Sequence, residues 1–405
     1  MINYFAKLYK CISQHKCIGQ HKCIIVRLYK ENIQPKMPPK KTKPSSPEPQ
    51  TDAPKNPVKP RTVKAKKIEE VPLVKQAESI VHPSVPAKIP LLIDSLTPEQ
   101  LESYRLRIRS ELPEYSTDNP KYEIVYKIRD DKPADYTRAI QEKEILKTRL
   151  KLTDPKTGQT NTLRSFAEIW EDTKSGLAEE FQASKDPDEA KWSLARKYNY
   201  KIATTFMPMY AKSIYEYFGA KSVLDPCAGW GDRMCGALAS TVVRRYVGFD
   251  PNQNLVEGYK KIQNDFGYKV TIHEGRHIKF DSGYDIYSVP FENSDSWLKE
   301  ERFDFAFTSP PFFDYEDYNP ENPRYRDWYS QFYEPLFKIT EKRLKPNAFF
   351  AIHIDDTSAG KIRDFLDDKV KIITSFKYCG RIGLVGGKSG KIRNVFLFQK
   401  TKPDE

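Results

Sequence analysis

The stretch Phe303–Phe312, FDFAFTSPPF in one-letter code, decides the fold that this sequence predicts. Its first part is apolar and rich in aromatic residues, which is typical of a buried strand. Pro310 and Pro311 then end the strand, because proline cannot donate a ladder hydrogen bond. A hydroxyl, a stiff turn and an aromatic ring are therefore predicted at the carboxyl end of a strand, where open α/β sheets bind their ligands.

This turn suits a pocket for a flat group that carries an NH2. The Ser309 hydroxyl and the Pro310 carbonyl can accept the two amino hydrogens, and the Phe312 ring can stack on the plane of the group. A proline-rich turn followed by a core phenylalanine would have the same composition. The motif therefore needs support from other parts of the chain.

Two upstream stretches give that support. Ser222–Arg233, SVLDPCAGWGDR, predicts a short strand ending in Asp225, a glycine-containing turn and the start of a helix. Glycine lets a backbone approach a ligand closely, and the carboxylate could meet the amino group, or a bridging water, of a zwitterionic ligand tail. Tyr246–Asn252, YVGFDPN, predicts a second strand that ends in Asp250. An acid there commonly binds ribose hydroxyls in Rossmann-like sheets, although Asp-Pro-Asn also suits a turn or a helix N-cap.

In this order, the three motifs resemble those of the class I S-adenosylmethionine-dependent methyltransferases, and among them the amino-methyltransferases of DNA. Ser309–Phe312 is closest to the Ser-Pro-Pro variant of their catalytic signature, which is usual in cytosine-N4 enzymes, but Phe replaces the usual Tyr. Asp225–Arg233 is similar to the methionine-binding turn, and resembles methylases predicted in phages and large DNA viruses. Phe206–Lys212 resembles the preceding cofactor motif. The resemblance covers residues 200–400, about half of the chain.

The resemblance implies an α/β, Rossmann-like methyltransferase that moves a methyl group from S-adenosylmethionine to an exocyclic amino group of a DNA base. Cytosine N4 is favoured over adenine N6. The alternatives are an RNA or protein-glutamine N-methyltransferase, or a catalytically silent nucleic-acid-binding fold. A third motif is expected at Val270–Glu274 or Tyr284–Glu292, and we favour the second, with Glu292 near the adenine; a surface-loop acid is the alternative.

The mechanism that the resemblance implies needs no metal and no covalent nucleophile. Fixed acceptors would draw the amino hydrogens out of the ring plane and build electron density on nitrogen, and a base in a duplex would first swing out. The implied catalytic residues are Ser309, Pro310, Pro311 and Phe312. The implied cofactor-binding residues are Asp225, Cys227, Ala228, Gly229, Gly231, Asp250, Pro251, Glu292 and Thr308.

The composition limits the class of protein. None of the apolar runs reaches eighteen residues, so no transmembrane helix and no membrane partner are expected. The six cysteines form no Cys-x-x-Cys pair. This suits a reducing, intracellular setting, which would be the cytoplasm or nucleus of a host cell if the protein is viral. No obligate protein partner is inferred.

The charge lies at the N-terminus. Residues 1–90 contain 18 Lys and Arg against 6 Asp and Glu, which accounts for the whole net charge of +12. They are expected to form a disordered, basic, Pro/Lys-rich tail that adds nonspecific phosphate affinity, or only aids solubility or localisation. Residues 1–36 carry a Cys/His repeat that fits no standard zinc site. Because Met37 is a plausible start, we expect them to be an extension without function.

The rest of the chain is expected to form two domains, a small helix-rich one over residues 91–195 and the methyltransferase domain over residues 196–405. Thr97 is predicted to cap a helix that begins at Pro98. The last two strands are predicted at Lys371–Phe376 and Arg393–Phe398 and should be antiparallel. His353 is interpreted as a core residue at a strand end.

Overall fold

The structure is a computed structural model that describes residues 88–401, except for residues 155–156, 274, 281–282, 314, 319–324, 358–359 and 387–389. The expectations for the basic tail and for residues 1–36 therefore lie outside the described residues. No helix in the described part is long and apolar enough to span a membrane.

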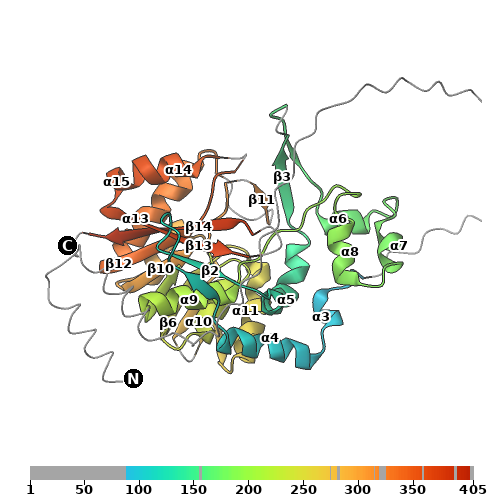
Figure 1. The fold of residues 1–405 in the computed structure, drawn as a ribbon, viewed down its shortest axis with the longest axis horizontal. Helices are drawn as coiled ribbons and strands as arrows, with labels where there is room; N and C mark the ends of the chain where they lie inside the picture. Colours follow the sequence, from blue (N-terminus) through green and yellow to red (C-terminus); the bar gives the residue numbers. More distant parts are fainter. Residues whose placement is uncertain are drawn as a thin grey trace, which may run out of the picture. The chain divides into compact units, whose positions relative to one another are not determined.

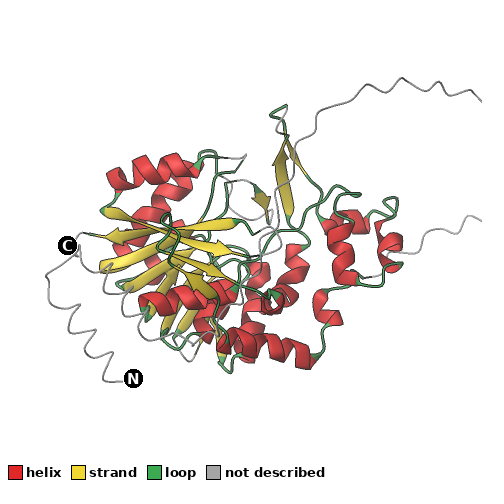
Figure 2. Ribbon diagram, in the orientation of Figure 1, coloured by secondary structure: helices red, strands yellow, loops and turns green. Residues whose placement is uncertain are grey.

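The described residues are built around a mixed sheet of eleven strands (Figures 1 and 2). In spatial order its strands are β1 (Glu114–Ser116), β2 (Ile124–Lys127), β13 (Phe376–Val385), β14 (Ile392–Lys400), β12 (Leu344–His353), β10 (Phe303–Thr308), β5 (Ser222–Asp225), β6 (Arg245–Phe249), β9 (Tyr284–Tyr287), β8 (His277–Phe280) and β7 (Val270–His273).

The middle of this sheet has the order of a Rossmann-like class I methyltransferase fold. The strands β9, β6, β5, β10 and β12 are parallel. Strand β14 then inserts antiparallel between β12 and β13. The chain runs outward in both directions from the boundary between β5 and β10, which is the topological switch point where such sheets bind ligands. The predicted fold class is confirmed.

Two hydrophobic clusters cover the two faces of the sheet. Successive residues of one strand alternate between them, because side chains of a strand point to opposite faces. Phe305 and Phe307 belong to one cluster and Ala306 to the other. In Figure 1, α9, α10 and α11 lie on one side of the sheet, and α13, α14 and α15 on the other. These helices are α9 (Pro208–Phe218), α10 (Asp232–Ala239), α11 (Val256–Asp265), α13 (Glu334–Arg343), α14 (Ile362–Asp364) and α15 (Val370–Ile373).

The remaining elements include the long helix α4 and several short ones. The helical ones are α3 (Leu92–Ser95), α4 (Pro98–Ser110), η1 (Lys132–Ala134), α5 (Asp135–Ile145), α6 (Phe166–Glu171), α7 (Leu177–Gln182), α8 (Pro187–Ser193), η2 (Gln253–Leu255), η3 (Phe291–Asn293), α12 (Asp295–Leu298), η4 (Tyr329–Tyr333) and η5 (Phe365–Lys369). Three strands form a second sheet, β11 (Glu316–Asp317), β3 (Arg149–Thr153) and β4 (Thr160–Thr162).

Residues 91–195 share both a sheet and a core with the rest of the described chain. Strand β2 pairs parallel with β13 and β3 pairs antiparallel with β11. One hydrophobic cluster runs from Ile108 to Leu397 without a break at residue 195. The segment that we expected to be a helix-rich domain is therefore mixed in structure and continuous with the larger sheet.

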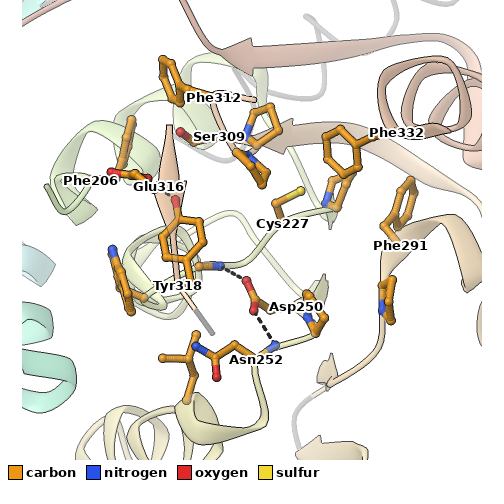
Figure 3. Close-up of a pocket in the computed structure, with 18 of the residues that line it drawn as sticks. Phe206, Cys227, Asp250, Asn252, Phe291, Ser309, Phe312, Glu316, Tyr318 and Phe332 are labelled. Carbon is orange, nitrogen blue, oxygen red and sulfur yellow. Dashed lines mark hydrogen bonds between the residues drawn. The ribbon is translucent and has the colours of Figure 1, made fainter. Parts of the chain in front are cut away.

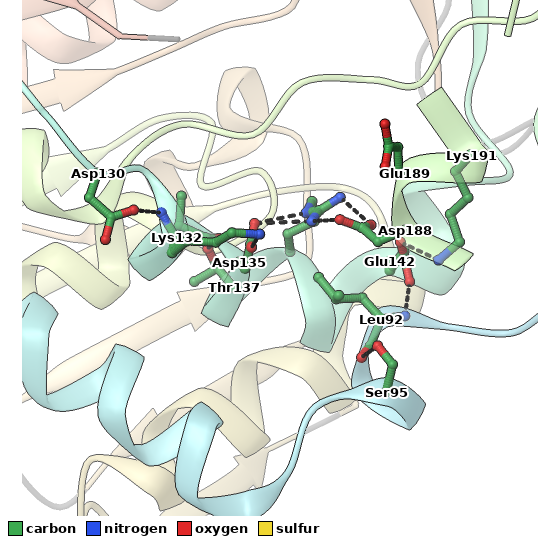
Figure 4. Close-up of polar contacts among 12 residues, drawn as sticks. Leu92, Ser95, Asp130, Lys132, Asp135, Thr137, Glu142, Asp188, Glu189 and Lys191 are labelled. Atoms are coloured by element: carbon green, nitrogen blue, oxygen red, sulfur yellow. Dashed lines mark hydrogen bonds and ion pairs between the residues drawn. The ribbon is translucent and has the colours of Figure 1, made fainter. Parts of the chain in front are cut away.

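Polar contacts fix the helices of this segment (Figure 4). The Lys191 ammonium lies 2.9 Å from the Glu142 carboxylate, and their side chains are 1% and 2% exposed. Glu142 also accepts the backbone N–H of Leu92. Arg138 bridges Asp135 and Asp188 at 3.0 and 2.8 Å. The Asp135 pair lies within α5, whereas the contacts of Glu142 with Leu92 and Lys191 and of Arg138 with Asp188 join α5 to α3 and α8.

Local predictions in the chain had mixed outcomes. The helix start is confirmed, since Thr97 accepts the N–H of Gln100 and the Gln100 side chain accepts the N–H of Thr97. The strand predicted at Lys371–Phe376 is wrong, because α15 ends at Ile373 and β13 begins only at Phe376. The β-branched residues of this segment favour a strand, but the segment is not buried against a neighbouring strand, and Ile372 is 72% exposed. Strand β14 covers its predicted partner.

The contact between α9 and α10 gives a first prediction. A Cβ atom on Gly236 would lie 2.6 Å from the Pro208 carbonyl oxygen and 2.9 Å from the Lys212 nitrogen. Alanine improves helix propensity by about 1 kcal/mol, but this clash involves backbone. We expect Gly236→Ala to lower the free energy of unfolding by about 1–3 kcal/mol, measured by urea denaturation. The exposed helix variant Glu179→Ala should change it by less than about 0.5 kcal/mol. An unchanged midpoint for Gly236→Ala would contradict the close packing.

Candidate active site

A cavity of about 330 Å³ lies where the three predicted motifs end (Figure 3). The turn after β5 contributes Cys227 and Gly229, the turn after β6 contributes Asp250, and the turn after β10 contributes Ser309 and Phe312. These strands are parallel neighbours, so their carboxyl ends meet at one edge of the sheet. The structure thus brings together motifs that are far apart in the sequence.

Most predicted site residues line this cavity, and four lie beneath it. The lining ones are Cys227, Gly229, Asp250, Pro251, Glu292, Ser309, Pro310, Pro311 and Phe312. The four below it are buried, and they are Asp225, Ala228, Gly231 and Thr308. Asp225 is fully buried. The direct contact that we expected between its carboxylate and a ligand amino group is therefore replaced in this structure by contacts with the protein.

Those contacts hold the glycine turn. One carboxylate oxygen of Asp225 lies 2.8 Å from Arg233 Nε and accepts the Tyr246 hydroxyl at 2.7 Å. The Arg233 guanidinium also donates to the Cys227 carbonyl. The Cys227 N–H reaches across to Thr308 Oγ1 at 3.1 Å. The turn is thereby tied to α10, β6 and β10 at once.

Asp250 faces the cavity from the end of β6. Its carboxylate accepts the backbone N–H groups of Gly229 and Asn252 at 2.9 and 3.0 Å (Figure 3). Gly229 has φ +57°, a left-handed backbone conformation that favours glycine. Burial raises the pKa of Asp250 to about 6. The carboxylate is thus oriented by the backbone, and its protonation state changes in mild acid.

The turn after β10 is held from behind. The Tyr333 hydroxyl donates to the Pro311 carbonyl at 2.8 Å and accepts the Phe313 N–H at 3.3 Å. Phe313 has φ +57°, which is uncommon for a residue with a side chain and is strained. Ser309 Oγ lies 3.0 Å from His353 Nδ1. Burial lowers the pKa of His353 to about 3, so the imidazole is neutral at physiological pH.

Sequence reasoning missed much of the cavity wall. Aromatic side chains form a large part of it. Phe206, Trp230 and Phe291 belong to the predicted motif stretches, although they were not singled out, and Tyr318, Tyr325, Trp328 and Phe332 lie outside them. Tyr325, Trp328 and Phe332 follow a helical spacing that could have indicated a shared face. Nothing local distinguishes Tyr318. The partner of His353 was also missed, because Ser309 lies on a different strand.

Glu316 is the least expected polar residue in the wall. It lies on β11, which pairs with β3 and so belongs to the smaller sheet. Its carboxylate accepts the Tyr318 hydroxyl, and burial raises the pKa of Glu316. The Tyr318 ring packs against Trp230, with centroids 5.6 Å apart. Residues outside the three motifs therefore shape this side of the cavity.

Glu292 lies on η3, just after β9, as favoured from the sequence. It accepts the hydroxyl of Tyr325. In the described part of the chain, no group of three or more His, Cys, Asp or Glu side chains is placed to hold a metal ion.

Comparisons with known proteins give only weak likenesses. No protein-family model and no curated protein matches the chain. A solved rRNA methylase from Streptococcus thermophilus is 12% identical, with 49% of this chain and 100% of that chain covered and a TM-score of 0.33. The O-methyltransferase TomG from Streptomyces achromogenes, in complex with SAM, is 13% identical, with 54% and 92% covered and a TM-score of 0.35. The N-methyltransferase NodS from Bradyrhizobium japonicum is 8% identical, with 48% of this chain and 96% of that chain covered and a TM-score of 0.30. The fold is shown by the strand order of the sheet and not by these likenesses.

The pair beneath the turn gives a second prediction. Arg233→Met leaves the fully buried Asp225 carboxylate without its charged partner. We expect a loss of about 3–5 kcal/mol in the free energy of unfolding, measured by chemical denaturation, and a smaller loss for Arg233→Lys, which keeps the charge. Arg363 pairs with Asp355 at the surface, with side chains 47% and 29% exposed. Arg363→Met should therefore cost less than about 1 kcal/mol. Equal losses for the two methionine variants would contradict a supporting role for the buried pair.

Proposed function

We propose that this chain is an S-adenosylmethionine-dependent N-methyltransferase that acts on an exocyclic amino group of a DNA base, with cytosine N4 favoured over adenine N6. One observation carries the proposal: the Ser-Pro-Pro-Phe turn and Asp250 line the same cavity. The first suits a flat amino group, and the second suits a ribose. A donor and an acceptor of the methyl group could therefore be held within one cavity.

The cavity residues fit the proposed cofactor. Asp250 would accept the ribose hydroxyls, because its carboxylate faces the cavity from the strand end. The open space at Gly229, where the nearest atom to an added Cβ would lie 3.9 Å away, leaves room for the methionine part. Pro251, Leu255 and Phe291 provide apolar surface for an adenine ring. A volume of about 330 Å³ lies within the usual range for ligand pockets.

The chain's own residues would make the amino nitrogen a better nucleophile. S-adenosylmethionine, when bound, would supply an electrophilic methyl group as its sulfonium becomes a thioether, and the methylated nitrogen would then release one proton. The Ser309 hydroxyl and the Pro310 carbonyl would accept the two amino hydrogens, which returns electron density from the ring to nitrogen. Their fixed dipoles would also stabilise the positive charge that develops on that nitrogen. Phe312 would stack on the base, and the aromatic wall would exclude water.

Asp250 provides a prediction about pH. Ribose hydroxyls donate to a carboxylate, so cofactor binding needs the deprotonated form of a group whose pKa is raised to about 6. We expect the Kd for S-adenosylmethionine to be constant well above pH 6. It should rise about tenfold for each pH unit below that value. Isothermal titration calorimetry would measure it. In Asp250→Asn, binding should be weaker than in the wild type above pH 6 and should lack this acid limb, so the difference between the two proteins should shrink in acid; an acid limb that persists in this variant would assign the titration to another group.

Ser309 provides the test of catalysis. Because its hydroxyl faces the substrate and not the ribose acid, Ser309→Ala should keep the Kd for S-adenosylmethionine. It should lower kcat by about 100-fold or more. Ser288→Ala is the matched control, since Ser288 is buried but does not line the cavity. Methyl transfer at the wild-type rate by Ser309→Ala would remove the residue from the mechanism.

The substrate itself is tested with the full chain and methyl-labelled S-adenosylmethionine. DNA, RNA and a glutamine-containing peptide are offered separately, and the products are identified by mass spectrometry. N4-methylcytosine in DNA is the expected product, and N6-methyladenine would keep the enzyme class but change the base. Methylation of RNA or glutamine alone would overturn the choice of DNA. Absence of methyl transfer to all three substrates would overturn the proposal that the chain is a methyltransferase.

A further inference from the structure

Ser309 follows the end of β10, and His353 is the last residue of the neighbouring strand β12. Strands β10 and β12 are parallel, and Thr308 pairs with Ile352 in their register. The next residue on each strand therefore lies beside the other, and Ser309 Oγ is 3.0 Å from His353 Nδ1. This is a hydrogen-bond distance between a cavity-lining side chain and a histidine behind it.

The His353 ring is held in place by aromatic neighbours. Its centroid lies 5.3 Å from that of Phe206 and 6.2 Å from that of Phe312, both edge to face. Burial is the main cause that lowers the pKa of His353 to about 3, with Arg393 and Arg233 adding to it and Asp355 opposing it. A neutral imidazole has one nitrogen that donates a hydrogen bond and one that accepts. The ring can thus serve as an acceptor with a fixed direction.

The direction of the Ser309 hydroxyl matters for the proposed reaction. A hydroxyl can donate its hydrogen or accept one through its lone pairs. If Ser309 donated to the substrate nitrogen, it would occupy the lone pair that must attack the methyl group. If it accepts an amino hydrogen, it strengthens that lone pair. The reaction therefore needs the hydroxyl hydrogen of Ser309 to point away from the substrate.

We propose that His353 is a positioning residue whose Nδ1 accepts a hydrogen bond from the Ser309 hydroxyl. Ser309 can then act only as a hydrogen-bond acceptor toward the amino group. The inference rests on the proposed function and extends it to a residue outside the Ser-Pro-Pro-Phe turn. It requires the neutral tautomer with its proton on Nε2. His353 is thus part of the catalytic apparatus without touching the substrate.

Kinetics of two matched variants test the role. His353→Phe keeps an aromatic ring beside Phe206 but has no acceptor. His353→Asn offers a carbonyl oxygen near the position of Nδ1. We expect His353→Phe to lower kcat by about 10–100-fold with the Kd for S-adenosylmethionine unchanged, and His353→Asn to recover most of that loss. In a Ser309→Ala background, His353→Phe should have no further effect, because the two residues act as a unit. Wild-type kcat in His353→Phe, or equal losses in both backgrounds, would overturn the proposal.

A second measurement does not need turnover, and its main result comes from the wild-type chain. In the full chain labelled with ¹⁵N-histidine, long-range ¹H–¹⁵N spectra report which ring nitrogen carries the proton. We expect His353 to carry it on Nε2 between pH 5 and 9, and its Nδ1 signal to shift in Ser309→Ala. A proton on Nδ1 would overturn the proposal. If the wild-type chain methylates none of the offered substrates, the proposed function fails, while these spectra still decide the hydrogen bond.

Discussion

The ion pair between Asp225 and Arg233 holds the site in shape from below. Two charges in a protein interior lose their hydration, so a pair of this kind persists only when hydrogen bonds satisfy the remaining polar atoms. Here the carboxylate also receives the Tyr246 hydroxyl, and the guanidinium also donates to the Cys227 carbonyl. Each of these contacts comes from a different element. These contacts therefore hold the glycine turn in place relative to β6 and α10.

Parallel strand pairing carries this order to the neighbouring turns. Because β5 pairs with both β6 and β10, the position of one strand end fixes the other two. Asp250 then bonds to the N–H of Gly229, and the Cys227 N–H bonds to Thr308. The three turns are thus linked by hydrogen bonds as well as by the sheet. A cavity that must hold two reactants in line benefits from walls that cannot shift independently.

One wall of the cavity comes from a part of the chain outside the parallel strands. Strand β11 follows the Ser-Pro-Pro-Phe turn and pairs with β3, which precedes the parallel strands in sequence. It carries Glu316, with Tyr318 just beyond it, and both line the cavity. In Figure 3, Glu316 lies beside Phe206, and Tyr318 lies between Ser309 and Asp250. Lys151 of β3 also lines the cavity. Residues 91–195 therefore help to shape the cavity, and are more than a cover for the sheet.

The sequence by itself determined the strand ends, the glycine turn, the order of the motifs and the cap at Thr97. These features depend on neighbouring residues, because proline, glycine and capping side chains act on the backbone within a few positions. Only the tertiary structure decided that Asp225 is buried beneath the site, that Glu316 lines it and that His353 meets Ser309. Each of these depends on which strands become neighbours, and the register of distant strands leaves no mark on local sequence. The helix α15, where a β-branched run predicted a strand, follows the same rule, since packing overrides local propensity.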